Sequence, residues 1–190
     1  MIIWDTETTG TEETDAILSI AIVDSRTGEV LLDSLVCPPE HLVAWPRAEA
    51  MHGITPETVK GAPSMADLWP RVRELLAPGS AAYGAAFDVR LLAQSLGGGW
   101  QAEESSGEAA VLWHEDHEDQ AVLRVQCALL RYARHVGEPS RRGGFRWHKL
   151  ADAARAAGHD LQHAHTALAD AQATAAVWRY LDDQGVPVLS

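Results

Sequence analysis

The first ten residues, Met1-Ile-Ile-Trp-Asp-Thr-Glu-Thr-Thr-Gly10, place two carboxylates at alternate positions after a short apolar run. The run predicts a strand, and side chains two apart on a strand point to the same face. Asp5 and Glu7 therefore lie together, and their burial is costly unless a cation lies between them. Oxygen ligands of this kind suit Mg²⁺ or Mn²⁺. The alternative is a solvated strand end that carries two unrelated acids.

Three strand-forming segments come first in the chain, and helical segments with one further strand between them follow. Apolar and β-branched residues predict strands at residues 2–6, 17–24, 30–36 and 81–85. Pro70 is expected to kink or divide a helix that Ser64 and Asp67 cap and that runs to Leu76. Thr55-Pro56 predicts the start of another helix, with a capping Thr before Pro at the first helical position. Further helices are predicted at about 88–96, 127–136, 147–157 and 166–183, some of them ended by glycines. This order predicts a sheet covered by helices, in an α/β or α+β arrangement.

Residues 97–120 are predicted to form an acidic surface loop. They contain Gly97-Gly-Gly99 and seven acids without a basic residue, and a short strand at 111–113 is a weaker alternative. The run His114-Glu-Asp-His-Glu-Asp119 has residue types that bind metals, but its donors are contiguous and not spaced on one face. We interpret this run as a solvated acidic segment.

Length and apolar content predict one domain, residues 1–190, with a substantial core. No apolar run approaches the length of a membrane span, so no membrane partner is expected. The carboxylate pair begins at residue 5, which leaves no room before it for a signal peptide. Cys37 and Cys127 lack metal-ligand spacing and are expected to be free thiols. These observations predict a cytoplasmic protein.

Positive charge is concentrated in one segment. The chain has a net charge of −12, but residues 124–155 carry eight basic residues against two acids. Such clustering is typical of a surface that contacts phosphates. The alternative is a basic face whose side chains only pair with acidic neighbours.

Two further acids lie in the segments Phe87-Asp88 and His165-Thr-Ala-Leu-Ala-Asp170. With Asp5-Thr-Glu-Thr-Thr-Gly10 they resemble, in order, the three motifs of the DnaQ-like 3′–5′ exonucleases of the DEDDh type, relatives of polymerase proofreading subunits and of ribonuclease T. The resemblance extends from residue 1 to about residue 181. It implies a ribonuclease-H-like fold of the α/β class, with a mixed central sheet flanked by helices.

The resemblance also implies the roles of the five motif residues. Asp5 would bridge two Mg²⁺ or Mn²⁺ ions. Glu7 and Asp170 would be ligands of the first ion, and Asp88 would be a ligand of the second. His165 would be the general base. His163 competes with it, but only His165 has the spacing His-x-Ala-x-x-Asp. Two residues five apart in the middle of a helix lie about 140° apart. His165 must therefore precede the last helix if it is to face Asp170.

Substrate contacts are expected at positions outside the metal motifs. Thr6, Thr8 and Thr9 are candidates near the terminal nucleotide, where Gly10 permits close approach. Met51, His52 and Phe87 are candidates for the base pocket, although Met51 is equally well explained by core packing. The candidates for phosphate binding are Arg141, Arg142 and Arg146.

Two departures from the family pattern stand out. Gly84 occupies the position of a common asparagine, and Gln126-Cys127 replaces Asp-Thr, but neither change removes a metal ligand. The resemblance implies a metal-dependent 3′–5′ exonuclease that releases nucleoside monophosphates from single-stranded or frayed 3′ ends of DNA or RNA. A polymerase or a second copy of the chain is a candidate partner. The alternatives are a catalytically silent nucleic-acid-binding or polymerase-associated subunit and an endonuclease of the ribonuclease H type.

Overall fold

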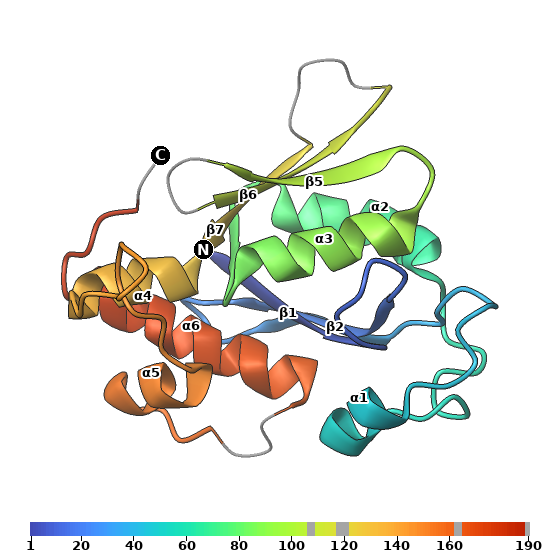
Figure 1. Ribbon diagram of the computed structural model, residues 1–190, viewed down its shortest axis with the longest axis horizontal. Helices are drawn as coiled ribbons and strands as arrows, with labels where there is room; N and C mark the ends of the chain where they lie inside the picture. The colour runs from blue at the N-terminus through green and yellow to red at the C-terminus, as the bar shows by residue number, and fades with distance from the viewer. Residues whose placement is uncertain (106–108, 117–121, 162–164, 189–190) are drawn as a thin grey trace.

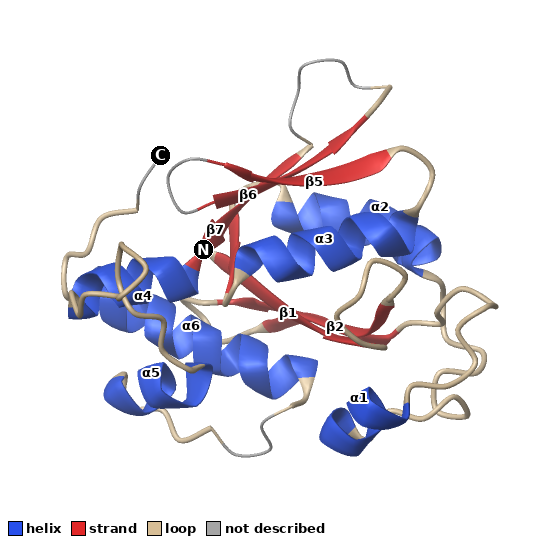
Figure 2. Cartoon of the chain, in the orientation of Figure 1, coloured by secondary structure: helices blue, strands red, loops and turns tan. Residues whose placement is uncertain are grey.

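The computed structural model describes residues 1–105, 109–116, 122–161 and 165–188. Its centre is one mixed sheet of seven strands, β1 (Ile2–Thr8), β2 (Ile17–Asp24), β3 (Val30–Leu35), β4 (Ser80–Ala82), β5 (Trp100–Ser105), β6 (Ala109–His114) and β7 (Leu123–Cys127). The strand order is β3-β2-β1-β4-β7-β6-β5 (Figures 1 and 2). β4 runs parallel to β1 and β7, and the other neighbouring pairs are antiparallel. The predicted mixed sheet is confirmed.

Helices cover both sides of this sheet. In the described residues they are α1 (Pro46–His52), α2 (Met65–Leu76), α3 (Ala85–Leu96), α4 (Ala128–Val136), α5 (Leu150–Ala156) and α6 (Ala167–Asp183). Figure 1 shows α2 and α3 on one side of β1 and β2, and α6 with α4 and α5 on the other. Ser64 caps α2 as predicted, because its hydroxyl accepts from the Asp67 amide and Asp67 accepts from the Ser64 amide.

Alternate residues of β1 face these two layers. Ile3 packs with Trp178 and the alanines of α6, whereas Trp4 packs with residues of α2 and α3. Asp5 and Glu7 follow the period of Ile3, so their side chains point toward the layer of α6. The fold therefore brings the carboxylate pair next to the start of α6.

The predicted surface loop at 97–120 is wrong at residues 100–105 and 109–114, which form strands, and the strand considered at 111–113 belongs to the second of them. β5 and β6 form an antiparallel hairpin at the edge of the sheet. Trp100 and Ala102 pack against the core, and Leu112 is fully buried. The interspersed acids obscured this alternation in the sequence, and charges on an edge strand also discourage pairing with other chains. Residues 117–119 of the acidic run lie outside the described residues.

Four smaller predictions also need correction. Thr55-Pro56 begins only turns, because the Thr55 hydroxyl accepts from the Thr58 amide and no helix follows. The helix in this region is α1, which has no buried residue and so carries little hydrophobic pattern. α2 continues through Pro70 without division. β7 was not predicted, and the helix expected from residue 127 begins after it, at Ala128.

No helix in the described residues is long and apolar enough to cross a membrane.

Candidate active site

Three carboxylates from opposite ends of the chain meet at one point. Asp5 and Glu7 come from β1, and Asp170 lies in the first turn of α6. One ligand oxygen from each lies within 4.8 Å of the others. α6 begins here because the Thr166 hydroxyl accepts from the Ala169 amide and caps the helix. The tertiary fold therefore assembles an acid cluster from residues 165 positions apart.

Asp88 approaches the same region from the other side of β1. It lies in the first turn of α3, is 3% exposed, and its Oδ1 accepts a hydrogen bond of 2.8 Å from the Thr6 hydroxyl. It is not part of the three-acid cluster. The bond to Thr6 orients the carboxylate and ties α3 to β1. We call Asp5, Glu7, Asp88 and Asp170 together the acidic site.

Burial raises the pKa values of all four acids, and repulsion by neighbouring acids adds to the rise for Asp5 and Glu7. Burial raises the pKa of Asp5 well above its ordinary value, and the charges of Asp88, Asp170 and Glu7 add to this. The pKa of Glu7 rises to about 7 through burial and the charges of Asp170 and Asp88. Burial raises the pKa of Asp88 to about 7 against the Thr6 hydrogen bond. Burial also raises the pKa of Asp170, with His165 opposing the rise.

This arrangement fits divalent cations. Within the described residues, no lysine or arginine forms an ion pair with any of the four acids. Asp170 Oδ1 is buried and has no hydrogen-bond partner among the residues that the structure describes. A buried, unpaired carboxylate oxygen among like charges is costly, and a bound cation removes that cost. Hard oxygen ligands favour Mg²⁺ or Mn²⁺ over softer metals.

His165 lies next to the acidic site and outside α6. It precedes the capping residue Thr166, so it occupies the loop position that its spacing from Asp170 requires. Its φ of 71° is in the left-handed region, which is uncommon for residues other than glycine and often marks a functional position. With Glu7 and His52 it lines a cavity of about 340 Å³. The competitor His163 lies outside the described residues.

Two hydrogen bonds of His52 hold the loop that faces His165. The amide of Ile54 donates to its Nδ1 at 3.0 Å, so its Nε2 carries the hydrogen that faces the carbonyl of Thr8 at 3.1 Å. Burial lowers the pKa of His52, which favours this neutral form. His52 therefore ties the segment after α1 to the end of β1. Met51 beside it is 63% exposed, so the core-packing explanation for Met51 is wrong.

The three threonines after Asp5 use their hydroxyls inside the protein. Thr6 donates to Asp88, Thr8 donates to the Gly10 carbonyl, and Thr9 donates to Asp15 at 2.6 Å. A Cβ at Gly10 would collide with the Asp15 carboxylate, so only glycine fits beside it. The hydroxyls thus shape the loop, and their hydrogens are not directed to solvent.

The basic segment 124–155 separates into two groups. Arg131 is buried against Asp182 and Trp178, Arg134 donates to the Pro187 carbonyl, and Arg155 pairs with Asp152 at 3.0 Å. Residues 138–148, which we call the arginine loop, fold back so that the Ser140 amide donates to the Gly144 carbonyl. The pairing explanation therefore holds for these three arginines, and contact of the arginine loop with phosphates stays a prediction.

Within the arginine loop, Arg141 and Arg142 are exposed, and in the described chain neither forms an ion pair. Arg146 pairs with Glu138 at 2.9 Å.

Phe87 is half-buried, and the Arg90 guanidinium lies over its ring, 5.4 Å from the centroid. The 340 Å³ cavity also contains Asp33 of β3, which no motif in the sequence indicated.

Comparison with known proteins gives a consistent result. The RNase_T family model, which describes exonucleases, matches residues 2–178. A protein of Escherichia phage 186, described as the uncharacterized exonuclease CP81, is 36% identical over 175 residues, which are 90% of this chain and 81% of the phage protein.

Solved structures share the fold. A structure of exonuclease X in complex with 5′ overhanging duplex DNA superposes with a TM-score of 0.64 at 24% identity, over 98% of this chain and 94% of that one. A structure of E. coli exonuclease I in complex with a dT13 oligonucleotide gives a TM-score of 0.66 at 20% identity, over 95% of this chain and 40% of that one. The ribonuclease-H-like fold expected from the sequence is confirmed.

Proposed function

Because this chain belongs to the RNase_T family of exonucleases, we propose that it is a metal-dependent 3′–5′ exonuclease that releases nucleoside monophosphates from single-stranded or frayed 3′ ends. One observation carries the proposal: Asp5, Glu7 and Asp170 meet within 4.8 Å beside the buried Asp88, and Glu7 and His165 line one cavity there. In the described part of the chain, no lysine or arginine is paired to these acids. A silent binding subunit would have no need of so costly a group of acids.

Four carboxylates can hold two divalent ions with balanced charge. In this proposal Asp5 would contribute to both ions, Glu7 and Asp170 to the first, and Asp88 to the second. Bound there, the ions would supply an activated water and would stabilise charge on the phosphate and the leaving oxygen. The acid cluster and the unpartnered Asp170 Oδ1 support this assignment.

The remaining steps are performed by side chains of the chain itself. His165 accepts the proton of the attacking water, since its ring lines the cavity beside Glu7. Thr6 holds the Asp88 carboxylate in place, and His52 fixes the backbone at the end of β1. The cavity beside these residues receives the terminal nucleotide. Met51, next to His52, and Phe87, next to Asp88, stay candidates for contact with the nucleobase, although neither side chain lines this cavity. Arg141 and Arg142 contact phosphates farther along the strand.

The substrate and the 3′ polarity follow from the family resemblance and from the similar structures. A duplex with a 5′ overhang, as in the exonuclease X complex, presents a recessed 3′ end, and the exonuclease I complex contains a single strand. The likeness is in the fold, so both features are proposed for this chain.

A digest of labelled oligonucleotides tests the proposal. A single strand with a 5′ label, incubated with Mg²⁺, should give a ladder that shortens from the 3′ end, and EDTA should abolish it. A matched strand with a blocked 3′ terminus and a circular single strand should stay intact. Cleavage of the circle would instead indicate an endonuclease, and the absence of any cleavage would indicate a silent subunit.

A further inference from the structure

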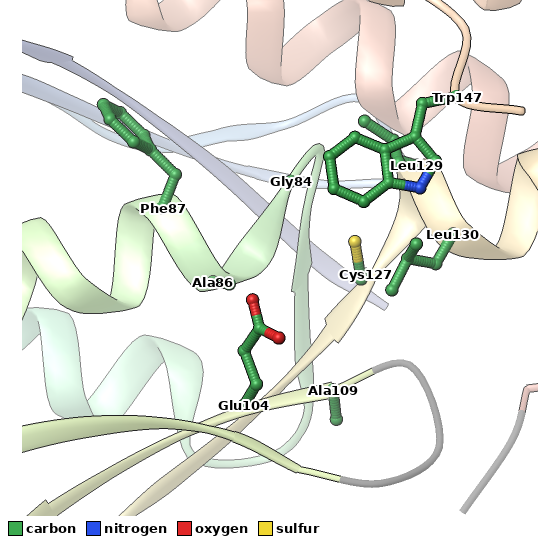
Figure 3. Close-up of a pocket in the computed structure, with 9 residues that line it drawn as sticks. All are labelled: Gly84, Ala86, Phe87, Glu104, Ala109, Cys127, Leu129, Leu130 and Trp147. Atoms are coloured by element: carbon green, nitrogen blue, oxygen red, sulfur yellow. The ribbon is translucent and has the colours of Figure 1, made fainter. Parts of the chain in front are cut away.

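A second cavity, which none of the four acids of the acidic site lines, lies at the start of α3 (Figure 3). Its volume is about 360 Å³. Ala86 belongs to α3, Cys127 ends β7, and Leu129 and Leu130 begin α4. Glu104 of the β5–β6 hairpin lies opposite, with its carboxylate directed toward Ala86 in Figure 3. The wall is therefore mainly apolar, and its one acid is at the rim.

The indole of Trp147 closes one side of this cavity. It comes from the arginine loop and reaches over Gly84 and Leu129 in Figure 3, yet 68% of its surface is exposed. A tryptophan that packs only one part of its ring leaves a flat aromatic surface for a second planar group. Exposed aromatic rings of this kind are the platforms on which proteins stack the bases of single strands.

Gly84 leaves the space beside the indole open. It caps α3 with φ of 94°, and a Cβ built on it would meet no atom within 4 Å. The family pattern resembled by the sequence commonly has asparagine here, whose side chain would extend into this space. The glycine of this chain therefore enlarges the opening between Trp147 and α3.

Position and charge favour one occupant, an unpaired nucleobase. Gly84 is one helical turn from Asp88, so the cavity adjoins the acidic site. Arg141 and Arg142, on the same loop as Trp147, are exposed and available to phosphates. Glu104 repels a phosphate from the opposite rim, so the base enters the cavity and its phosphate stays on the arginine side.

We propose that the cavity between Gly84 and Trp147 is a base-binding subsite, in which Trp147 stacks on one nucleobase upstream of the scissile phosphate. The inference rests on the proposed exonuclease function for the path of the strand. It adds a position at which the enzyme holds its substrate away from the reacting bond. Stacking of this kind is tolerant of sequence, because every base has a flat face.

Abasic substitution locates such a subsite. A set of single strands, each with one abasic nucleotide at a successive position from the 3′ end, is titrated against the wild-type protein without metal, so that no cleavage occurs. One upstream position should bind about 5- to 150-fold more weakly when its base is removed, the usual effect of losing one stacked base.

The same titrations with Trp147→Ala decide whether this residue is responsible. The variant should bind the intact strand as weakly as the wild type binds the critical abasic strand, and removal of that base should then have no further effect. Trp147→Phe should restore most of the difference. Phe145→Ala, which removes another exposed aromatic ring of the loop that does not line the cavity, is the matched control and should leave the profile unchanged.

Gly84→Asn provides an independent variant, since asparagine tolerates the left-handed backbone. It should reduce the effect of the critical abasic substitution. An abasic profile that is the same in wild type and Trp147→Ala would overturn the subsite, as would an oligonucleotide that fails to bind. Base-dependent binding in a protein that cleaves no 3′ end would overturn the exonuclease proposal and leave the subsite standing.

Discussion

The acidic site and the arginine loop differ in the sign of their charges and in their exposure to solvent. The acidic site draws residues from β1, α3 and α6, buries them and raises their pKa values. The arginine loop is a contiguous stretch of eleven residues, 138–148, and its two unpaired arginines are exposed to solvent. Buried like charges need a partner that the chain does not supply, whereas exposed charges are stabilised by water.

The difference explains how a chain of net charge −12 can hold a polyanion. The acids attract cations to one buried point, and these cations neutralise the site at which the phosphate reacts. The exposed arginines contact phosphates elsewhere along the strand. Changes in the acidic site should therefore affect chemistry, and changes in the arginine loop should affect binding.

The largest effect is expected from Asp5→Asn. This change keeps the shape of the side chain but removes a charge from the centre of the acidic site, so we expect cleavage to fall by more than about 10³-fold while the fold persists. Single-turnover cleavage in Mg²⁺ measures the loss, and thermal unfolding checks the fold. Activity within tenfold of wild type would contradict the proposed role of Asp5.

The next effect is expected from His165→Ala. Loss of the proton acceptor should reduce turnover about 10²- to 10³-fold, within the usual contribution of a general base, and leave binding of the strand unchanged. Single-turnover cleavage in Mg²⁺ measures the turnover, and titration of the labelled strand without metal measures the binding. His163→Ala is the control, and a larger loss in that variant would transfer the role to His163.

A smaller effect, confined to binding, is expected from Arg141→Gln combined with Arg142→Gln. Each lost contact to a single strand should lower the slope of log affinity against log salt by about 0.7, so the slope should change by about 1.4. Turnover at saturation should remain. Arg155→Gln, which removes an arginine paired with Asp152, is the matched control and should leave the slope unchanged. An unchanged slope in the double variant would show that the phosphates are held elsewhere.

The smallest effect is on the stability of the metal-free protein. Since the pKa of Glu7 is raised to about 7, the stability that its protonated form contributes is present at low pH and is lost as the pH rises through 7. Glu7→Gln stays neutral throughout, so it should raise the melting temperature at pH 8 by about 2–4 °C and have little effect at pH 5.

Added Mg²⁺ should reverse this difference in melting temperature between Glu7→Gln and the wild type. Mg²⁺ at pH 8 should stabilise the wild-type protein more than Glu7→Gln, because binding to the folded state raises its stability and the variant lacks one carboxylate. It should stabilise the wild type less at pH 5, where protons compete for the acids. An equal gain in melting temperature from Glu7→Gln at both pH values would mean that Glu7 does not titrate with a raised pKa.

Motif spacing was enough to locate the acidic site, but not to describe its neighbours. Asp5, Glu7, Asp88 and Asp170 stand in short segments whose order is typical of the family, and the structure brings them into one region. Asp33 and the cavity at Gly84 could not be found in this way. They depend on which strands and helices are neighbours in space, and no local pattern records that.

Local patterns determined most of the secondary structure of this protein. The apolar runs of β1 and β2 and the caps of α2 and α6 depend on residues close in sequence, so the sequence alone defined them. Only the tertiary structure decided the state of residues 100–114 and of the arginines. Trp100 becomes a strand residue by packing against Trp69, and Arg131 is buried by Asp182, 51 positions away. Such contacts stabilise conformations that local preference leaves undetermined, because burial and pairing outweigh intrinsic propensity.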